Sequence, residues 1–196
     1  MRSAKTVSIH QPYFFPWVGY FRKIVASDVF VLMDQVGFSK GSYINRTRIS
    51  SAQDWQWFGV SLKRQPLGSS LNLFEVDCSS FDLAKLKRKL EQSYSKAPFF
   101  EFYFELFFSH LELNINNGIC ELNRRIIELF LRTLDVNVRL VSMSELDIDL
   151  GHKKSDLVLE ICKAVNADMY LSGPFGKSYL NTEKFKREGI CVEYVE

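Results

Sequence analysis

The sequence lacks the features that identify several large functional classes. Its four cysteines form neither a CxxC pair nor a Cys/His spacing typical of zinc, so no metal site is expected. Lys and Arg (25) nearly balance Asp and Glu (23). The resulting net charge of +2 argues against a general nucleic-acid partner.

Long apolar runs are also missing. The two longest, Val29–Met33 and the Phe-rich stretch 97–108, are too short or too interrupted by glutamates to cross a bilayer. No apolar segment typical of a signal peptide follows the basic residues at the start of the sequence. These features predict a cytoplasmic protein with reduced cysteines and no membrane span.

Aromatic residues, in contrast, are abundant. The 17 Phe, 8 Tyr and 3 Trp make up 14% of the 196 residues, and hydrophobic residues together make up 46%. Aromatic side chains bury large areas and offer flat stacking surfaces. The composition therefore predicts a globular protein with a large core, or with a ring-shaped ligand.

Short apolar segments alternate with amphipathic ones at both ends of the sequence, which is typical of βαβ units. Strands are predicted at 6–9, 28–34, 138–141, 168–171 and 190–195, and helices at 17–26, 155–165 and 182–187. The fold class predicted is α/β, with a mixed, mainly parallel sheet flanked by helices.

The middle of the sequence has a different pattern. Two paired strands are predicted at Arg46–Ile49 and Gln56–Leu62, and a short strand at Leu73–Val76. Helical spacing then predicts three helices, at about 82–94, 98–115 and 119–134. We interpret the whole chain, 1–196, as a single α/β domain with an inserted three-helix segment at about 80–135.

Two polar side chains follow predicted strands near the start of the chain. His10 ends the first strand and Asp34 ends the second. Ligands of open α/β sheets bind beyond the carboxyl ends of strands, and a His–Asp pair there is suited to proton transfer. The alternatives are a histidine that caps a strand end and an aspartate that starts a turn.

Basic residues follow in the predicted loop and strand. Arg46 and Arg48 share one face of a strand, with Lys40 and Asn45 before them. Arginine forks suit phosphate or carboxylate groups. The alternative is a solvated edge strand that its charge protects from aggregation.

Two segments near the carboxyl end could bind an anion or substrate. His152 and Lys153 precede a predicted helix, where backbone amides favour anions. Ser172 and Gly173 follow a strand, with Tyr179 just beyond. Neither segment has the spacing of a phosphate-binding loop, and ordinary turns would explain both.

The opening run Ile9–Phe21, IHQPYFFPWVGYF, resembles the start of the WbqC-like family. The similarity extends over nearly the whole chain, through the segments 27–31, 45–49, 93–100, 153–155, 170–173 and 179–180, and Asp34. Gln35 departs from the pattern, because a second acidic residue is expected there. This departure weakens any metal site built on adjacent carboxylates.

The resemblance implies a bacterial protein of O-antigen or other surface-polysaccharide biosynthesis. Some members of the family are described as glycine transferases that act on amino sugars. The family's motif positions retained in this sequence are His10, Gln11, Asp34, Asn45, Arg46, Arg48, Ser172, Gly173 and Tyr179. Neither the resemblance nor the residues identify a cofactor.

The leading functional hypothesis is an enzyme that transfers an aminoacyl (glycyl) or acyl group to the amine of a nucleotide-linked amino sugar. His10, oriented by Asp34, would accept the proton of the attacking amine. Basic residues would hold the diphosphate, and Ser172 and Gly173 would contact the substrate or the developing oxyanion. The donor would be an activated acyl or aminoacyl compound whose carrier the sequence does not identify.

Two other hypotheses remain open. One is a non-catalytic sugar-nucleotide-binding or scaffold protein, in which the aromatic helix 98–116 presents an interface. The other is a transferase that uses a nucleotide to activate its own donor, with His10 and Lys153 around the phosphates. The missing phosphate-binding loop counts against the second.

Overall fold

The computed structural model describes residues 4–39, 41–52, 54–80 and 82–195. The chain divides into two compact units. The sheet unit contains Trp17–Asp34 together with the segments before Pro12 and after Asp135. The hairpin–helix unit contains Pro12–Pro16 and Gln35–Asp135.

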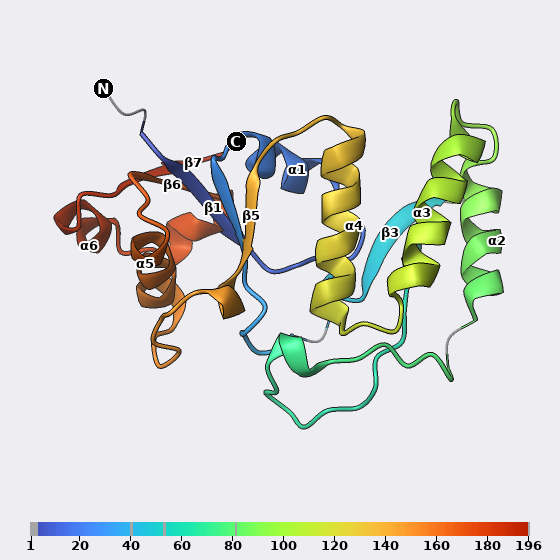
Figure 1. Ribbon diagram of the computed structural model, residues 1–196, viewed down its shortest axis with the longest axis horizontal. Coiled ribbons are helices and arrows are strands. Elements are labelled where there is room, and N and C mark those ends of the chain that lie inside the picture. Colours follow the sequence, from blue (N-terminus) through green and yellow to red (C-terminus); the bar gives the residue numbers. More distant parts are fainter. Residues whose placement is uncertain (1–3, 40, 53, 81, 196) are drawn as a thin grey trace. The chain divides into compact units, whose positions relative to one another are not determined.

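The sheet unit is built on five parallel strands in the order β5-β2-β1-β6-β7 (Figure 1). Their bounds are β1 Thr6–His10, β2 Val29–Leu32, β5 Arg139–Ser142, β6 Met169–Ser172 and β7 Cys191–Tyr194. All four residues of β2 are buried, as its continuous apolar sequence indicates. The α/β fold class with a mainly parallel sheet is confirmed.

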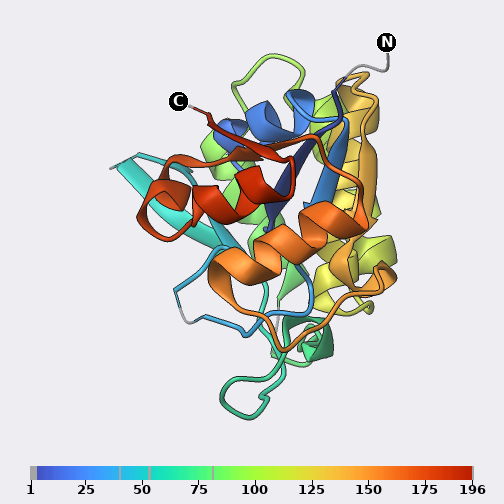
Figure 2. The same ribbon diagram turned by 90° about the vertical axis from the view of Figure 1, so that its left-hand side faces the viewer.

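Helices connect these strands and cover both faces of the sheet. Figures 1 and 2 show α5 (Lys154–Ala164) and α6 (Thr182–Arg187) on one face and α1 (Val18–Val25) on the other. The connection from β1 to β2 and the connection from β5 to β6 run in opposite directions across the sheet. Because both crossovers are right-handed, their helices lie on opposite faces. Short 3-10 helices, η2 (Met143–Glu145) and η3 (Pro174–Ser178), follow β5 and β6.

The strand order has one topological switch point. The chain runs outward from β1 through β2 to β5, then returns to β6 on the opposite side of β1 and continues to β7. In doubly wound sheets, the connections leave a crevice at such a point, beyond the carboxyl ends of the strands. The carboxyl ends of β1 and β6 therefore mark the place where a ligand is expected.

The hairpin–helix unit combines an antiparallel pair with three helices. The strands are β3 (Arg46–Ser51) and β4 (Asp54–Gly59), and the helices are α2 (Leu83–Tyr94), α3 (Phe100–Asn114) and α4 (Ile119–Thr133). Its core is rich in aromatic side chains from every part of the unit, among them Phe14, Phe58, Phe74, Phe104 and Phe108. Much of the high aromatic content is therefore core packing.

Two local predictions differ from the structure. The predicted strand Leu73–Val76 is wrong: Leu71–Leu73 form the 3-10 helix η1, and Glu75 and Val76 make only isolated bridges. Helix α3 begins two residues after Pro98, because Phe99 has the left-handed backbone angle φ 62°, which no regular α-helix accommodates. The single domain with an inserted segment at about 80–135 stays a prediction.

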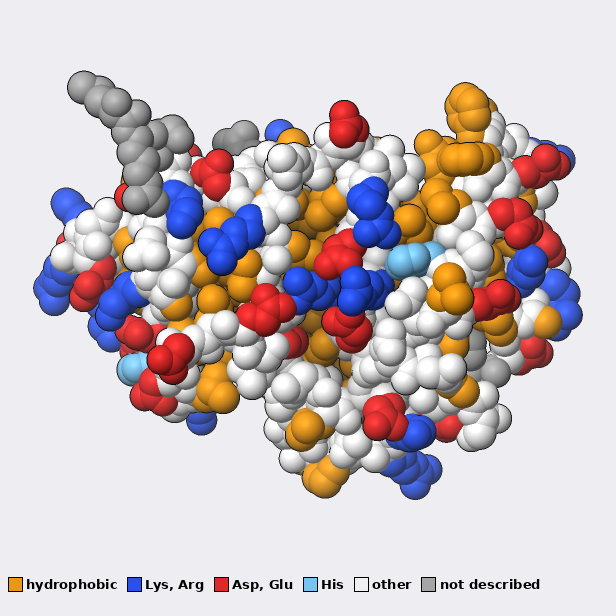
Figure 3. Space-filling view, in the orientation of Figure 1, with side chains coloured by type: hydrophobic (Ala, Val, Ile, Leu, Met, Phe, Trp, Pro, Cys, Tyr) orange, Lys and Arg blue, Asp and Glu red, His pale blue; other side chains and the backbone are white. Residues whose placement is uncertain are grey.

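None of the helices in the part of the chain that the structure describes is long and apolar enough to cross a membrane. Charged side chains of both signs are mixed on the face shown in Figure 3, without a large area of one charge. This distribution agrees with the small net charge of +2.

Candidate functional site

His10 and Ser172 end neighbouring strands of the sheet unit, on either side of the switch point. Strands β1 and β6 pair in parallel with Val7 opposite Tyr170, so both strands end at the same edge. Strand β2 lies on the other side of β1, with Leu32 opposite His10, and Asp34 follows two residues later. Three of the predicted site residues are therefore placed at one edge of one sheet.

The His10 imidazole is held in a defined protonation state. Its Nδ1 lies 3.1 Å from the Gln11 carbonyl oxygen, which can only accept a hydrogen bond, so Nδ1 carries the proton and Nε2 is unprotonated. The Gln11 carbonyl also accepts a hydrogen bond from the Tyr20 hydroxyl at 3.0 Å. The rings of Tyr20 and Trp17 pack edge-on against the imidazole, at centroid distances of 4.9 and 6.2 Å.

Burial lowers the pKa of His10 from 6.5 to about 4, because the surroundings disfavour the charged imidazolium. The positive charge of Lys23 lowers this pKa further, and the hydrogen bond to Gln11 opposes the shift. At physiological pH the imidazole is therefore neutral, and it is suited to accept a proton at Nε2.

Asp34, which follows β2, is held in place by a residue that follows the neighbouring strand β5. Its carboxylate accepts hydrogen bonds from the Ser144 backbone N–H, at 3.0 Å, and from the Ser144 hydroxyl. Ser144 belongs to η2, directly after β5. The partner of His10 Nδ1 is the Gln11 carbonyl, and orientation of the imidazole by Asp34 stays a prediction.

Ser172 is buried at the end of β6. Its hydroxyl donates to the Gly173 carbonyl at 3.1 Å, and burial raises the pKa of the Tyr170 hydroxyl on the same strand. A Cβ at Gly176 would lie 2.0 Å from the Ser172 hydroxyl oxygen, so only glycine lets η3 close over Ser172. Tyr179, which directly follows η3, is 42% exposed.

His152 and Lys153 lie before α5, which starts on the carboxyl side of the sheet because it runs back from β5 toward β6. His152 Nε2 is 3.7 Å from the Asp149 carboxylate, and Lys153 is exposed. The hydroxyl of Ser155, one turn further, accepts a hydrogen bond from the Asn181 backbone N–H at 2.9 Å. Ser155 therefore ties α5 to the turn before α6.

The remaining predicted residues belong to the hairpin–helix unit. The amide of Asn45 donates to the Val60 carbonyl at 2.7 Å and so fixes the open end of the hairpin. Arg46 and Arg48 stack on tryptophan rings of β4, at 4.1 and 4.2 Å from guanidinium carbon to ring centroid. Lys40 lies outside the described residues.

Sequence reasoning missed Lys23, the most unusual charged residue of the sheet unit. It is 7% exposed, and its ammonium donates to the Ile9 carbonyl at 3.1 Å. Burial lowers its pKa from 10.5 to about 8, and no carboxylate pairs with it in the part of the chain that the structure describes. Lys23 lies three residues after Tyr20 on the buried side of α1, and this helical spacing could have indicated its burial from the sequence.

Comparison with known proteins assigns the chain to a family. The WbqC-like protein family matches residues 11–196. The chain belongs to the WbqC-like protein family. A relative from Mycobacterium tuberculosis (strain H37Rv), uncharacterized protein Rv1507c, is 30% identical over 194 residues, covering 98% of this chain and 82% of its own length. No solved structure matches the chain significantly.

Membership of the WbqC-like family suggests a role in surface-polysaccharide biosynthesis. The resemblance noted in the sequence divides between the two units of this WbqC-like protein. His10 ends β1 and Gln11 follows it, whereas Phe14 is fully buried in the core of the hairpin–helix unit and donates its backbone N–H to the Tyr43 carbonyl at 2.9 Å. Part of the opening motif therefore contributes to the hydrophobic core rather than to a candidate site.

The buried charge of Lys23 gives a prediction about stability. Between pH 10.5 and 8 the amine of Lys23 is protonated in the unfolded chain but still largely neutral in the folded chain. The free energy of unfolding therefore decreases as the pH falls through this window. Below pH 8 the penalty is complete, at about 3 kcal/mol. Because Lys23→Met also loses a hydrogen bond worth about 1 kcal/mol, we expect a net gain of about 2 kcal/mol at pH 7.

Urea unfolding of the unmodified protein and of Lys23→Met, at pH 7 and at pH 10, measures this effect. The gain in the free energy of unfolding of Lys23→Met should be smaller at pH 10. The matched control is Lys163→Met, because Lys163 is ion-paired with Glu160 at 3.0 Å and its pKa is raised. A gain from Lys23→Met that is the same at both pH values would contradict a buried charge as its cause.

Proposed function

We propose that this protein is a cytoplasmic enzyme of surface-glycan biosynthesis that transfers an aminoacyl (glycyl) or acyl group to the amine of a nucleotide-linked amino sugar. The observation that carries the proposal is His10 at the switch point of a doubly wound sheet, neutral and with Nε2 unprotonated. Family membership supports the glycan context.

The reaction needs one proton acceptor and one stabilised oxyanion. The amine nitrogen of the sugar attacks the acyl carbon, and the carbonyl electron pair moves to its oxygen. His10 Nε2 takes the proton that the nitrogen loses. When the carbonyl re-forms, the bond to the donor's leaving atom breaks, and the imidazolium gives its proton to that atom. A pKa of about 4 makes this second transfer favourable.

Other residues of the sheet unit would hold the substrates. Ser172 and Gly173 lie at the end of β6, beside β1, where they would contact the acyl group or its oxyanion. His152 and Lys153, before α5, would interact with phosphate oxygens. Burial, together with the positive charge of Lys23, lowers the pKa of His10 and so keeps the imidazole neutral beside an anionic substrate.

The direct test is product formation. The protein is incubated with nucleotide-linked sugars that carry a free amine and with glycyl or acetyl thioesters, and products are identified by mass spectrometry. We expect the mass of one acyl group on the acceptor, with its amine converted to an amide. Nucleotide sugars that bind but are never modified by any thioester would contradict transfer from this donor class.

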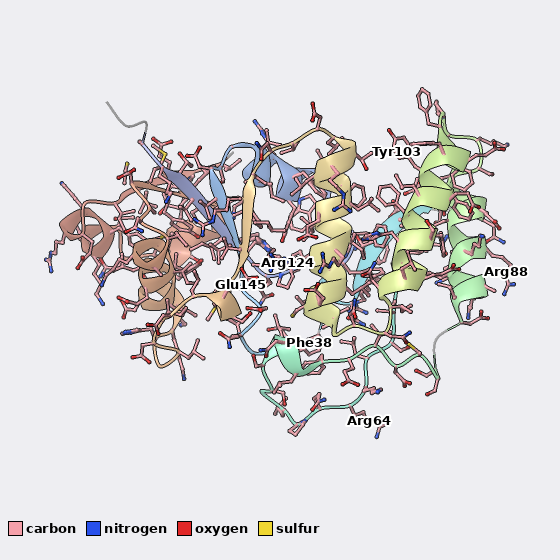
Figure 4. All side chains as sticks on the ribbon, viewed as in Figure 1. Phe38, Arg64, Arg88, Tyr103, Arg124 and Glu145 are labelled. Carbon is pink, nitrogen blue, oxygen red and sulfur yellow. The ribbon has the colours of Figure 1, made fainter. Side chains whose placement is uncertain are left out.

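The alternative, a sugar-nucleotide-binding scaffold without catalysis, is favoured by one observation. Phe99 and Phe102 at the start of α3 are 76% and 67% exposed, and the ring of Phe102 packs against that of Tyr103, which is labelled in Figure 4. Exposed aromatic side chains of this size are typical of protein interfaces. This alternative predicts binding without turnover, together with a larger assembly that Phe102→Glu disrupts.

A further inference from the structure

The hairpin β3–β4 carries an unusual alternation of arginine and tryptophan on one face. Arg48 lies opposite Trp57 in the strand register, with Arg46 and Ser50 on the same side of β3 and Trp55 on the same side of β4. We call Arg46, Arg48, Trp55 and Trp57 the arginine–tryptophan face. The opposite side of the hairpin, with Thr47, Ile49 and Phe58, is buried.

The four side chains form a continuous stack. The Arg46 guanidinium lies 4.1 Å from the Trp57 ring centroid, and the Arg48 guanidinium lies 4.2 Å from that of Trp55 and 5.4 Å from that of Trp57. The two indoles meet edge to face, with centroids 5.2 Å apart. Stacking orders the guanidinium planes before any ligand arrives, which reduces the entropy lost on binding.

The hydrogen-bonding capacity of the two arginines on this face is unused by the residues that the structure describes. Arg46 and Arg48 make neither a hydrogen bond nor an ion pair with the described residues, and no acidic side chain shares their face of the described strands. Arg46 and Arg48, whose Cα atoms lie about 7 Å apart along one strand, therefore present guanidinium donors with a charge that no described acidic residue neutralises. This arrangement suits an anion with two neighbouring phosphoryl groups.

The backbone behind the face is held in place. Lys89 of α2 donates to the Trp57 carbonyl at 2.9 Å, and Ser93 of α2 donates to the Ser50 carbonyl at 2.6 Å. A Cβ at Gly59 would lie 2.5 Å from that of Arg46, so glycine at this position leaves room for the arginine. The face is therefore built on rigid elements rather than on a loop.

We propose that the arginine–tryptophan face binds a nucleoside diphosphate. Trp55, which is 40% exposed, stacks on the base, and Arg46 and Arg48 bind the two phosphates. This nucleotide site is additional to the phosphate contacts proposed for His152 and Lys153, and it does not depend on the proposed function. It concerns the hairpin–helix unit by itself.

Tryptophan fluorescence tests the proposal directly. The chain has three tryptophans, so in Trp17→Phe the emission comes from Trp55 and Trp57 alone. Titration with UDP, dTDP and GDP is expected to quench this emission with at least one of them, because the base stacks on Trp55. Pyrophosphate and the free nucleoside, which each supply half of the contacts, are expected to bind at least tenfold more weakly.

Variants distinguish this face from general charge attraction. Calorimetry should show a loss of roughly tenfold in affinity for the same diphosphate in Trp55→Ala, since stacking on one base is worth about 1–3 kcal/mol. Arg48→Lys, which keeps the charge but loses the planar fork, should lose a similar factor. The matched control is Arg64→Lys, because Arg64 is exposed in the loop after β4 (Figure 4).

The outcomes separate this proposal from the proposed function. Quenching together with losses in Trp55→Ala and Arg48→Lys, but not in Arg64→Lys, supports the face even when no acyl transfer is found. Equal losses in Arg48→Lys and Arg64→Lys, or unchanged affinity in both Trp55→Ala and Arg48→Lys, would overturn it. Acyl transfer by a protein whose arginine–tryptophan face binds no diphosphate would overturn this inference alone.

Discussion

His10→Ala is expected to lower the rate of acyl transfer by roughly 10² to 10⁴, the usual contribution of a general base, while the fold is retained. The hydrogen bond of Nδ1 goes to the Gln11 carbonyl, the next residue in the chain, so this bond does not join separate strands of the sheet. Product formation and thermal melting should be measured on the same preparation.

The matched control is His110→Ala, because His110 Nε2 is likewise 3.0 Å from a backbone carbonyl, that of Arg125, but lies in α3. Its transfer rate should equal that of the unmodified protein. For the unmodified protein, kcat/KM should fall as the pH is lowered through about 4, because His10 is then protonated and cannot accept a proton. Full activity in folded His10→Ala would exclude the proposed role.

Asn123→Ala is expected to destabilise the protein by about 2–5 kcal/mol. Asn123, on α4, is fully buried, and its amide nitrogen donates to the carbonyls of Pro12 and Ile44 at 2.8 and 2.7 Å. These two bonds join the opening motif, the segment before β3 and α4 within one unit. Alanine leaves two buried carbonyls without a donor, at about 1–3 kcal/mol each.

Urea unfolding measures this loss. Asn114→Ala is the comparison, because Asn114 donates one hydrogen bond within its own helix, to the His110 carbonyl at 2.8 Å, and should lose less than about 1 kcal/mol. Equal losses from the two variants would show that the bonds of Asn123 do not have the structural role that its burial indicates.

Much of the sheet unit could be predicted from the sequence. Its strands are short apolar runs and its helices have clear apolar stripes, so period and length identify both. The handedness of βαβ crossovers then limits the topology, and it brings the ends of β1, β2 and β6 to one edge. The placement of His10, Asp34 and Ser172 at that edge follows from the fold class alone.

Side-chain partners were much harder to predict. Lys23 is a charged residue in a buried position, and ordinary patterns assign lysine to the surface. Asn123 is identified only by contacts with carbonyls 79 and 111 residues away in the chain. The stacking of Arg46 and Arg48 on Trp57 and Trp55 depends on the register of the hairpin, which the sequence did not specify to the residue.

A crystal structure with a bound nucleotide-linked amino sugar would test the central claim most directly, namely that acyl transfer takes place at the carboxyl edge of β1 and β6. The account predicts the acceptor nitrogen within about 3 Å of His10 Nε2, close to Ser172 and Gly173. An amino sugar bound at any other edge or face, with only water beside His10, would contradict it.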